Sequence, residues 1–360
     1  MYIPGIWASS KRSSAPAATS FLAVGHETSP YVSVYPFSSG LGTKYANPAT
    51  LPQGNVRRLT FNSTGSVLAL AVESSFSYGG ASKSIMAFPW SSSGFGTIYS
   101  DPSVLPIVEA NSPEGYSIAF NSAGTAIVLG VSYSGVGSRA TAWTWSNASG
   151  FGTKYGNPAA PTGGVQVQAA KFNPADSSLV LGINSSSLGI SAYRWTNATG
   201  WGNKYTNPSV ATPYGISFNN SGNAIVSSRT TTPYINGWPF SDSTGFGTKY
   251  GNPATLPPSS GRGIAFNPAG DTVSLAHDTN ASFSVYPFSA GFGTKYADPA
   301  TVVAAAGWDT TFNTAGTAVA YALLGSSPYV SVYPWSAGFG TKYANPATLP
   351  TGNGLSVAFI

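Results

Sequence analysis

Side chains that could carry out acid–base chemistry are few in this sequence. Its 360 residues include two histidines, His26 and His277, and eleven Asp and Glu residues. Each histidine precedes an acid, in the pairs His26-Glu27 and His277-Asp278. A histidine beside a carboxylate can serve as a catalytic acid or base, but catalysis requires that further groups converge on it. The elements that carry the two pairs therefore decide whether they can form one site.

Motifs for other kinds of chemistry are missing. The sequence has no Gly-x-Ser-x-Gly elbow, no His-x-x-x-His pair and no phosphate loop, and no helix follows its glycine-rich stretches to receive a dinucleotide. A calcium site needs six or more oxygen ligands, which one or two neighbouring acids cannot supply. There is no cysteine, so disulfides and thiolate metal sites are excluded. The sequence predicts a protein that is not an enzyme and binds no cofactor.

A nine-residue stretch, GFGTKYGNP, recurs along the chain. It stands at 150–158 and 245–253, and looser copies begin at Gly40, Gly94, Gly200, Gly291 and Gly338. A period of about 50 residues built from strands is typical of a β-propeller with one four-stranded blade per repeat. Apolar residues make up 42% of the chain without helical spacing, and Gly, Pro, Ser, Thr and Asn replace the usual charged residues. We therefore expect an all-β, seven-bladed β-propeller.

The two ends of the chain predict how the ring closes. A Phe-Asn turn follows the first strand of six repeats, from Phe61-Asn62 to Phe312-Asn313, and Phe359 near the end is the seventh phenylalanine. The first repeat opens at 21–27 with a second strand. We expect the C-terminal strand to complete the N-terminal blade, which leaves no open edge. The expected parts are an extended arm at 1–20 and a propeller at 21–360, with blade 1 at 21–48 plus 354–360 and blades 2 to 7 at about 56–102, 115–158, 165–208, 213–253, 261–299 and 306–346.

In such a ring, His26 and His277 both follow second strands, in blades 1 and 6, and a whole blade separates them. We therefore expect the two pairs not to meet, and interpret them as loop residues copied with the repeat. Residues flanking the first strands should line the central channel. The charged candidates there are Arg58, Glu114, Lys171, Arg262 and Asp309.

An aromatic residue ends the third strand of every repeat, as in the pattern IAFNSAG…TAWTW. These aromatics are Phe37, Trp90, Trp145, Trp195, Phe240, Phe288 and Trp335. The pattern resembles the tryptophan–aspartate (WD) repeat propellers, although no aspartate follows the aromatic and the Gly-His dipeptide of that family is missing. The resemblance implies the propeller fold without that family's structural hydrogen-bond network. The repeat style also looks like that of WD-repeat-like proteins encoded by bacteriophages and environmental bacteria.

Six repeats carry a lysine on the expected outermost strand, and the second repeat has Ile98 there. The lysines are Lys44, Lys154, Lys204, Lys249, Lys295 and Lys342. Lysine on an edge strand opposes edge-to-edge pairing, because a second sheet would have to desolvate the charge. Alternatively, the lysines and their neighbouring tyrosines form a belt that meets an anionic surface or a glycan.

Three neighbouring repeats share a longer loop after the third strand, with the sequences WSNASGF, WTNATGW and FSDSTGF. Aromatic rings beside Asn, Ser and Thr are what sugar-binding propellers use. Trp145, Trp195 and Trp201 are therefore candidate glycan contacts; the alternative is that the loops are solvated turns.

The first 20 residues lack the apolar core of a signal peptide, and no apolar run approaches the roughly 20 residues that span a bilayer. The net charge of +5 is spread along the chain, so we expect neither membrane insertion nor nucleic-acid binding. Tyr2, Ile3, Ile6 and Trp7 lie in a Pro-, Ser- and Ala-rich arm suited to docking on a larger assembly.

These features and the phage-like repeat style predict a non-enzymatic scaffold on the exterior of a virion, docked through its arm to other proteins of the particle. The expected location is the virion or the extracellular space. Two alternatives remain open: a propeller lectin that binds a host-surface glycan, and a bacterial protein-interaction scaffold.

Overall fold

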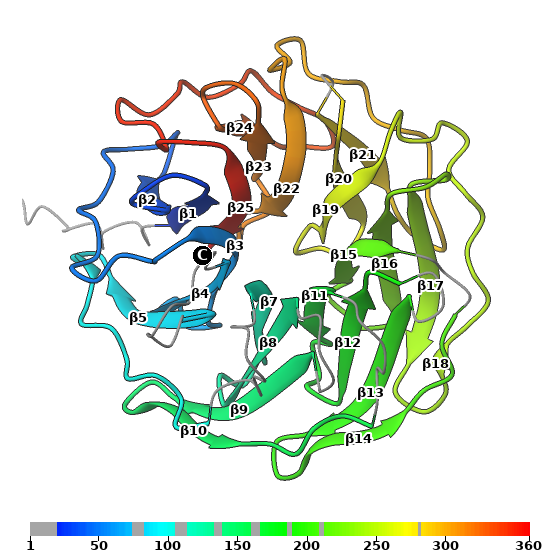
Figure 1. Ribbon diagram of the computed structural model, residues 1–360. Coiled ribbons are helices and arrows are strands. Elements are labelled where there is room, and N and C mark those ends of the chain that lie inside the picture. The colour runs from blue at the N-terminus through cyan, green and yellow to red at the C-terminus, as the bar shows by residue number, and fades with distance from the viewer. Residues whose placement is uncertain are drawn as a thin grey trace, which may run out of the picture.

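The computed structural model describes residues 20–73, 83–104, 114–132, 139–159, 166–185, 189–208, 212–279 and 282–360. All regular elements in these residues are β-strands, arranged as seven sheets around a common axis (Figure 1). The prediction of an all-β, seven-bladed propeller is confirmed. The predicted arm residues Tyr2, Ile3, Ile6 and Trp7 lie outside the described part, and Ser20 already begins a strand.

Each blade runs from an innermost first strand to an outer edge. Blade 1 combines β25 (Gly354–Phe359) with β1 (Ser20–His26) and β2 (Val32–Phe37). Blade 2 contains β3 (Asn55–Phe61), β4 (Val67–Glu73), β5 (Ile85–Ser91) and β6 (Gly94–Phe95). Blade 3 contains β7 (Glu114–Phe120), β8 (Ala126–Ser132), β9 (Ala140–Ser146) and β10 (Gly150–Lys154). Blade 4 contains β11 (Val167–Phe172), β12 (Ser178–Ile183), β13 (Ile190–Thr196) and β14 (Gly200–Lys204).

The remaining blades follow the same order. Blade 5 contains β15 (Pro213–Phe218), β16 (Ala224–Arg229), β17 (Ile235–Ser241) and β18 (Gly245–Phe246). Blade 6 contains β19 (Gly261–Phe266), β20 (Thr272–His277) and β21 (Phe283–Pro287). Blade 7 contains β22 (Ala306–Phe312), β23 (Ala318–Leu324) and β24 (Val330–Pro334). In blades 1, 6 and 7 the fourth strand is reduced to one bridge each: Phe37–Leu41, Phe288–Phe292 and Trp335–Phe339.

The ring closes where the two ends of the described chain meet. β25 pairs antiparallel with β1, with Leu22 opposite Phe359 and Val24 opposite Val357. The backbone N–H of Phe21 donates to the carbonyl of Ile360 at 3.0 Å. The predicted closure by the C-terminal strand is confirmed, and β1 is thereby paired on both sides.

The hydrophobic core lies between neighbouring blades and is built on the aromatic that ends each third strand. Trp145 packs edge-to-face with Tyr99 of the preceding blade, at 5.0 Å between ring centres, and with Phe120 at 5.1 Å. Trp195 repeats the arrangement with Tyr155 at 5.0 Å and Phe172 at 5.0 Å. Edge-to-face pairs at this separation stabilise a fold by more than the apolar area they bury would predict. The third-strand aromatic therefore holds adjacent blades together.

Both histidines belong to this framework. His26 and His277 are fully buried, and each ring bonds within its own blade: Nε2 meets Ser33 Oγ at 3.1 Å in blade 1 and Ser284 Oγ at 3.2 Å in blade 6. Burial lowers the pKa of each imidazole to about 4. As expected from the sequence, the two pairs do not form one site. The interpretation as loop residues is wrong for the histidines, because His26 ends β1 and His277 ends β20.

Mild acid is expected to destabilise the fold through these histidines. Between pH 6.5 and about 4 the unfolded chain protonates both imidazoles and the folded chain does not. Stability is therefore lost as the pH falls through this window, by up to about 3 kcal/mol per histidine. Urea midpoints measured near neutral pH and at the acid end of the window test this. Equal midpoints would contradict it, and a His26→Gln, His277→Gln variant should show a flatter pH dependence.

Candidate functional site in the central channel

Every innermost strand carries a β-bulge at the same place. In blade 2, Val56 pairs with Val72 and Arg58 with Ala71, so Arg57 is the extra residue. The same shift leaves out Tyr116, Gln168, Trp308 and Leu355, and in blades 5 and 6 it spans Tyr214–Gly215 and Arg262–Gly263. Bulges redirect a side chain and are frequent next to active sites. We call Arg57, Tyr116, Gln168, Tyr214, Arg262, Trp308 and Leu355 the bulge ring.

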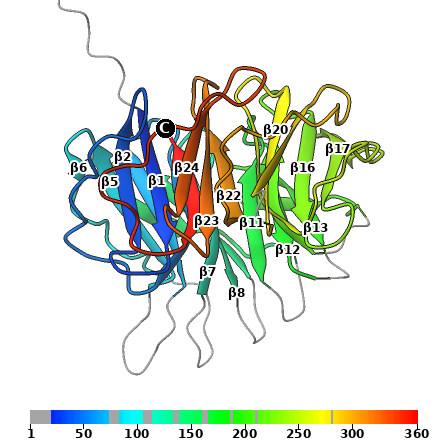
Figure 2. The same ribbon diagram turned by 90° about the horizontal axis from the view of Figure 1, so that it is seen from above.

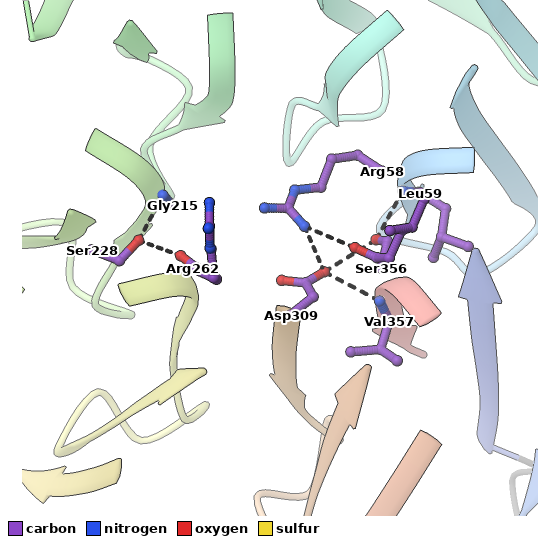
Figure 3. Close-up of polar contacts among 9 residues, drawn as sticks. Arg58, Leu59, Gly215, Ser228, Arg262, Asp309, Ser356 and Val357 are labelled. Atoms are coloured by element: carbon purple, nitrogen blue, oxygen red, sulfur yellow. Dashed lines mark hydrogen bonds and ion pairs between the residues drawn. The ribbon is translucent and has the colours of Figure 1, made fainter. Parts of the chain in front are cut away.

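Arg262 is the most constrained member of the bulge ring. Its guanidinium lies 4.6 Å from the centre of the Tyr214 ring and 4.5 Å from that of Trp308. Its Nε donates to Asp278 Oδ1 at 2.7 Å, and its Nη2 donates to Oδ2 of the same carboxylate. The bidentate pair and the two cation–π contacts fix the plane of the guanidinium. Ser228 ties the backbone below it, accepting from Gly215 N and donating to Arg262 O (Figure 3).

A second polar cluster surrounds Arg57. Its Nη2 lies 2.6 Å from Glu73 Oε2, and the Tyr116 hydroxyl donates to Glu73 Oε1 at 3.2 Å. Burial, assisted by the charge of Glu73, raises the pKa of Tyr116 to about 12. Burial also raises the pKa of Glu114, at the start of β7, and Glu73 adds to the effect. In this part of the ring, burial and the charge of Glu73 both favour the protonated forms of Tyr116 and Glu114.

A cavity of about 260 Å³ occupies the centre of the propeller, and its lining begins one residue beyond the bulge ring. Arg58 Nη1 lies 3.3 Å from Asp309 Oδ2 and donates to Leu355 O at 3.2 Å (Figure 3). Asp309 Oδ2 also accepts from Ser356 Oγ and Val357 N, both at 3.1 Å. Arg58 and Asp309 therefore join blades 7, 1 and 2 along the cavity wall.

Lys171 is the one large side chain in its layer of the cavity. The six equivalent positions carry small residues: Thr60, Ala119, Ser217, Ala265, Thr311 and Ala358. Lys171 is exposed to the cavity, and no residue in the described ranges bonds or pairs with its ammonium group. The surrounding protein lowers the pKa of Lys171; Asp309 opposes this shift and the charge of Arg58 adds to it. Such an amine has a larger uncharged fraction, which can act as a base.

The charges of three arginines from blades 2 and 6 all affect the Tyr214 phenol in the channel. Burial raises the pKa of the Tyr214 phenol, whereas the positive charges of Arg58, Arg262 and Arg57 lower it. The channel thus combines fixed cations, half-buried aromatic rings and a free amine. Among the described residues, no group of three or more His, Asp or Glu side chains is arranged to hold a metal ion.

The structure brings together the five charged residues that the sequence assigns to the channel. Arg58, Lys171 and Asp309 line the cavity, Arg262 lies in the bulge ring, and Glu114 is half-buried beside the Glu73 cluster. Sequence reasoning missed Arg57, Glu73, Tyr116, Tyr214, Asp278 and Trp308 as parts of this site. One signal could have found the ring members, because each stands four residues before the phenylalanine that ends its first strand.

The candidate glycan contacts are placed in the core. Trp145 and Trp195 are 5% and 2% exposed, and their indole N–H groups donate to Asn147 and Asn197 at 2.9 and 3.0 Å. Trp201 packs edge-to-face on Trp195 at 5.5 Å. The expected stacking surface is absent at Trp145 and Trp195, since these aromatics end their third strands and alternate inward.

Five of the six lysines of the repeat bind their own loops. Lys154 Nζ donates to Asn157 Oδ1 at 2.7 Å and Lys249 Nζ to Asn252 Oδ1 at 2.6 Å. Lys44, Lys342 and Lys295 make the same contact with Asn47, Asn345 and Asp298. Of the six, Lys154 and Lys204 lie on a fourth strand. The five lysines that make this contact hold the turn after the tyrosine. Edge protection and an anionic partner stay predictions.

Comparison with known proteins supports the fold. No protein-family model and no curated protein sequence matches the chain. A structure from Bacteroides fragilis, described as a candidate 6-phosphogluconolactonase, is similar with a TM-score of 0.68, 11% identity and coverage of 96% of this chain and 100% of that chain. The periplasmic gluconolactonase PpgL of Pseudomonas aeruginosa is similar with a TM-score of 0.67, 12% identity and coverage of 95% and 99%. A chain of the mitotic checkpoint complex is similar with a TM-score of 0.58 and 12% identity, and the match covers 84% of this chain and 79% of that chain. This similarity fits the WD-repeat resemblance.

These similarities correct two expectations. The prediction of a non-enzymatic virion scaffold, with its lectin and protein-scaffold alternatives, is wrong, and so is the prediction that the chain is not an enzyme. Several of the similar structures carry lactonase names, and no finding supports the link to phages or a virion. The scarcity of titratable residues misled the sequence argument, because the fold gathers several of the few charged side chains in one channel. No membrane-crossing helix occurs among the described residues; an extracellular location and the expected partners stay predictions.

Proposed function

We propose that this protein hydrolyses a small lactone in its central channel, with Lys171 as the general base. The observation that carries the proposal is the unpaired amine of Lys171 in the central cavity that it shares with Arg58 and Asp309. Its six equivalents in the other blades are small, so the repeat alone does not require a lysine there. The lactonase names of similar propellers, which show no more than the fold, suggest the class of ester bond.

The proposed reaction needs one base and one cation. The uncharged Lys171 amine removes a proton from water as the water oxygen bonds to the lactone carbonyl carbon. Arg58, held by Asp309, is positioned to donate to the oxyanion of the tetrahedral intermediate. Collapse of the intermediate breaks the ring C–O bond, and the Lys171 ammonium returns its proton to the leaving alkoxide. The product is a hydroxy acid, whose ionisation releases one proton to solvent.

The size of the channel and the bulge ring limit the substrate. A volume of about 260 Å³ is near the lower end of small-molecule pockets, which begin at roughly 300 Å³. Tyr214 and Trp308 present half-buried rings at one end of the cavity, beside the fixed Arg262. Aromatic faces beside a cation suit the C–H face and hydroxyl groups of a sugar-acid lactone.

The proposal is tested by proton release from δ-gluconolactone, its 6-phosphate and γ-butyrolactone in a pH-stat, with spontaneous hydrolysis subtracted. We expect the protein to accelerate opening of at least one sugar-acid lactone, and the simple butyrolactone less. Heat-denatured protein is the control for trace catalysis. Rates equal to the spontaneous ones for all three lactones would overturn the proposal.

A further inference from the structure

On the face opposite the bulge ring, three seams between blades are filled by one loop residue each. The innermost strands end on this face, where the C-terminus lies (Figure 2). The residues are Asn147, Asn197 and Asp242, each two positions after the aromatic that ends the third strand. We call the place that each one occupies a seam seat.

The contacts in a filled seat are specific. Asn147 Oδ1 accepts from Asn62 Nδ2 at 3.2 Å and from Trp145 Nε1 at 2.9 Å, and its Nδ2 donates to Ser66 Oγ at 3.1 Å. Its backbone carbonyl accepts from the Tyr99 hydroxyl at 2.7 Å. Asn197 meets Asn121, Trp195 and Tyr155 in the same way. The seats of Asn147 and Asn197 therefore recognise a primary carboxamide with a second carbonyl nearby. The third seat holds the Asp242 carboxylate instead, which accepts from Asn173 Nδ2, Ser177 Oγ and Ser178 Oγ.

Four seams lack this occupant: the seam between blades 1 and 2, where Ser92 stands at the equivalent position, and the three consecutive seams before blades 6, 7 and 1. Blades 6, 7 and 1 have a loop two residues shorter after the third strand, with no Asn or Asp in it. The tyrosines that face these three seams are Tyr250, Tyr296 and Tyr343, and no described residue accepts a hydrogen bond from their hydroxyl groups. Between blades 6 and 7 this leaves a pocket of about 590 Å³, lined among others by Asn267, Asp271, Tyr296, Trp335 and Ala337.

The pocket between blades 6 and 7 keeps the chemistry of the filled seats and strengthens it. Trp335 stands where Trp145 does, and its Nε1 donates to no acceptor in the described residues. Tyr296 stands where Tyr99 does, 5.1 Å from Trp335 between ring centres. Asp271 replaces Ser66, and only its Oδ1 is used, by Asn267 Nδ2 at 2.8 Å and Thr272 Oγ1 at 3.1 Å. A carboxylate accepts from an amide N–H more strongly than a hydroxyl does.

We propose that the pocket between blades 6 and 7 binds an asparagine unit from outside the chain. The carboxamide oxygen accepts from Trp335 Nε1, the carboxamide nitrogen donates to Asp271 Oδ2, and the adjoining carbonyl accepts from the Tyr296 hydroxyl. Asp271 selects the amide against a carboxylate of the same shape, since two carboxylates would repel each other. The site is separate from the channel and does not depend on lactone hydrolysis.

The probe for this site is N-acetyl-L-asparagine N-methylamide, titrated into protein labelled with ¹⁵N at its tryptophan indoles. The Trp335 indole resonance, identified by its loss in Trp335→Phe, is expected to shift. The Trp145 and Trp195 resonances should stay in place, because their seats are filled. The corresponding blocked aspartate is the matched control and should bind at least about 10-fold more weakly. No shift at Trp335, or equal binding of the two probes, would overturn the proposal.

Two variants that copy residues from other repeats of the chain should change asparagine binding without disrupting the fold. Asp271→Ser copies Ser66 and should weaken asparagine binding and remove the preference over aspartate. Replacing Ser336-Ala337 by Ser-Asn-Ala-Ser, the loop sequence of blade 3, should fill the seat from within and abolish binding while raising the melting temperature. Unchanged affinity in the loop variant would contradict the assignment of the pocket. Asparagine binding in a Lys171→Met protein should equal that of the wild type.

Discussion

Lys171→Met is expected to lower kcat/KM for lactone hydrolysis by at least about 100-fold, the usual contribution of a general base. Methionine keeps the unbranched side chain and the packing of its stem but cannot accept a proton. Lys171 has no hydrogen bond or ion pair within the described residues, so thermal stability should change by less than about 0.5 kcal/mol. Initial rates in a pH-stat and a melting curve, measured on the same preparation, check both parts.

Lys204→Met is the matched control, since Lys204 lies at the outer edge of the same blade and should keep wild-type activity. The pH profile adds a readout that lost stability would not produce. Because Lys171 must be uncharged, kcat/KM of the wild type should rise with pH and level off below the ordinary pKa of a lysine. The variant should lose this rise. A Lys171→Met protein with wild-type kcat/KM would remove Lys171 from the mechanism, while any remaining lactone hydrolysis would leave the function itself standing.

The ring and its closure follow from local features of the sequence. The repeated glycine-rich stretch gives the period. Phe359, which lacks the asparagine that follows it in the other repeats, shows that the C-terminal strand is the first strand of blade 1. Both depend on strand pairing, which each repeat encodes separately. The fourth strand was less predictable: in blades 1, 6 and 7 the loop before it is two residues shorter, and only one bridge forms.

The site could be predicted only in part, because its geometry depends on register. Charge at the first strands indicated Arg58, Lys171 and Asp309, but simple alternation does not show that a bulge at Arg57 or Trp308 adds a neighbouring residue to the channel wall. The tryptophans failed for the opposite reason. Asn147 beside Trp145 looked like a solvated loop, whereas the indole uses that asparagine as its hydrogen-bond acceptor. Asn147 also bonds Asn62, Ser66 and Tyr99 of the preceding blade, and one repeat alone does not reveal these contacts across the seam.

Removal of residues 354–360 is expected to abolish the folded state. Leu355, Val357 and Phe359 are almost fully buried, and losing each costs about 2 kcal/mol of apolar burial. The truncation also removes the partners of Leu59 N and Asp309 Oδ2 and leaves β1 with an open edge. Together these losses approach the whole stability of a typical domain, about 5–15 kcal/mol. Circular dichroism should show no cooperative melting transition, and the protein should aggregate through β1.

A circular permutant distinguishes loss of the strand from loss of chain order. It begins at Gly354, joins Ile360 to Ser20 through Ser-Thr-Gly, and ends at Asn353, so that β25 and β1 become a hairpin. The three added residues copy 63–65, which connect the equivalent strands of blade 2. Since Phe21 and Ile360 already exchange backbone hydrogen bonds at 3.0 and 3.1 Å, the permutant should melt cooperatively near the wild-type temperature. A truncated protein that melts like the wild type would show that the ring holds without β25; an unfolded permutant would mean that closure requires β25 to be delivered last along the chain.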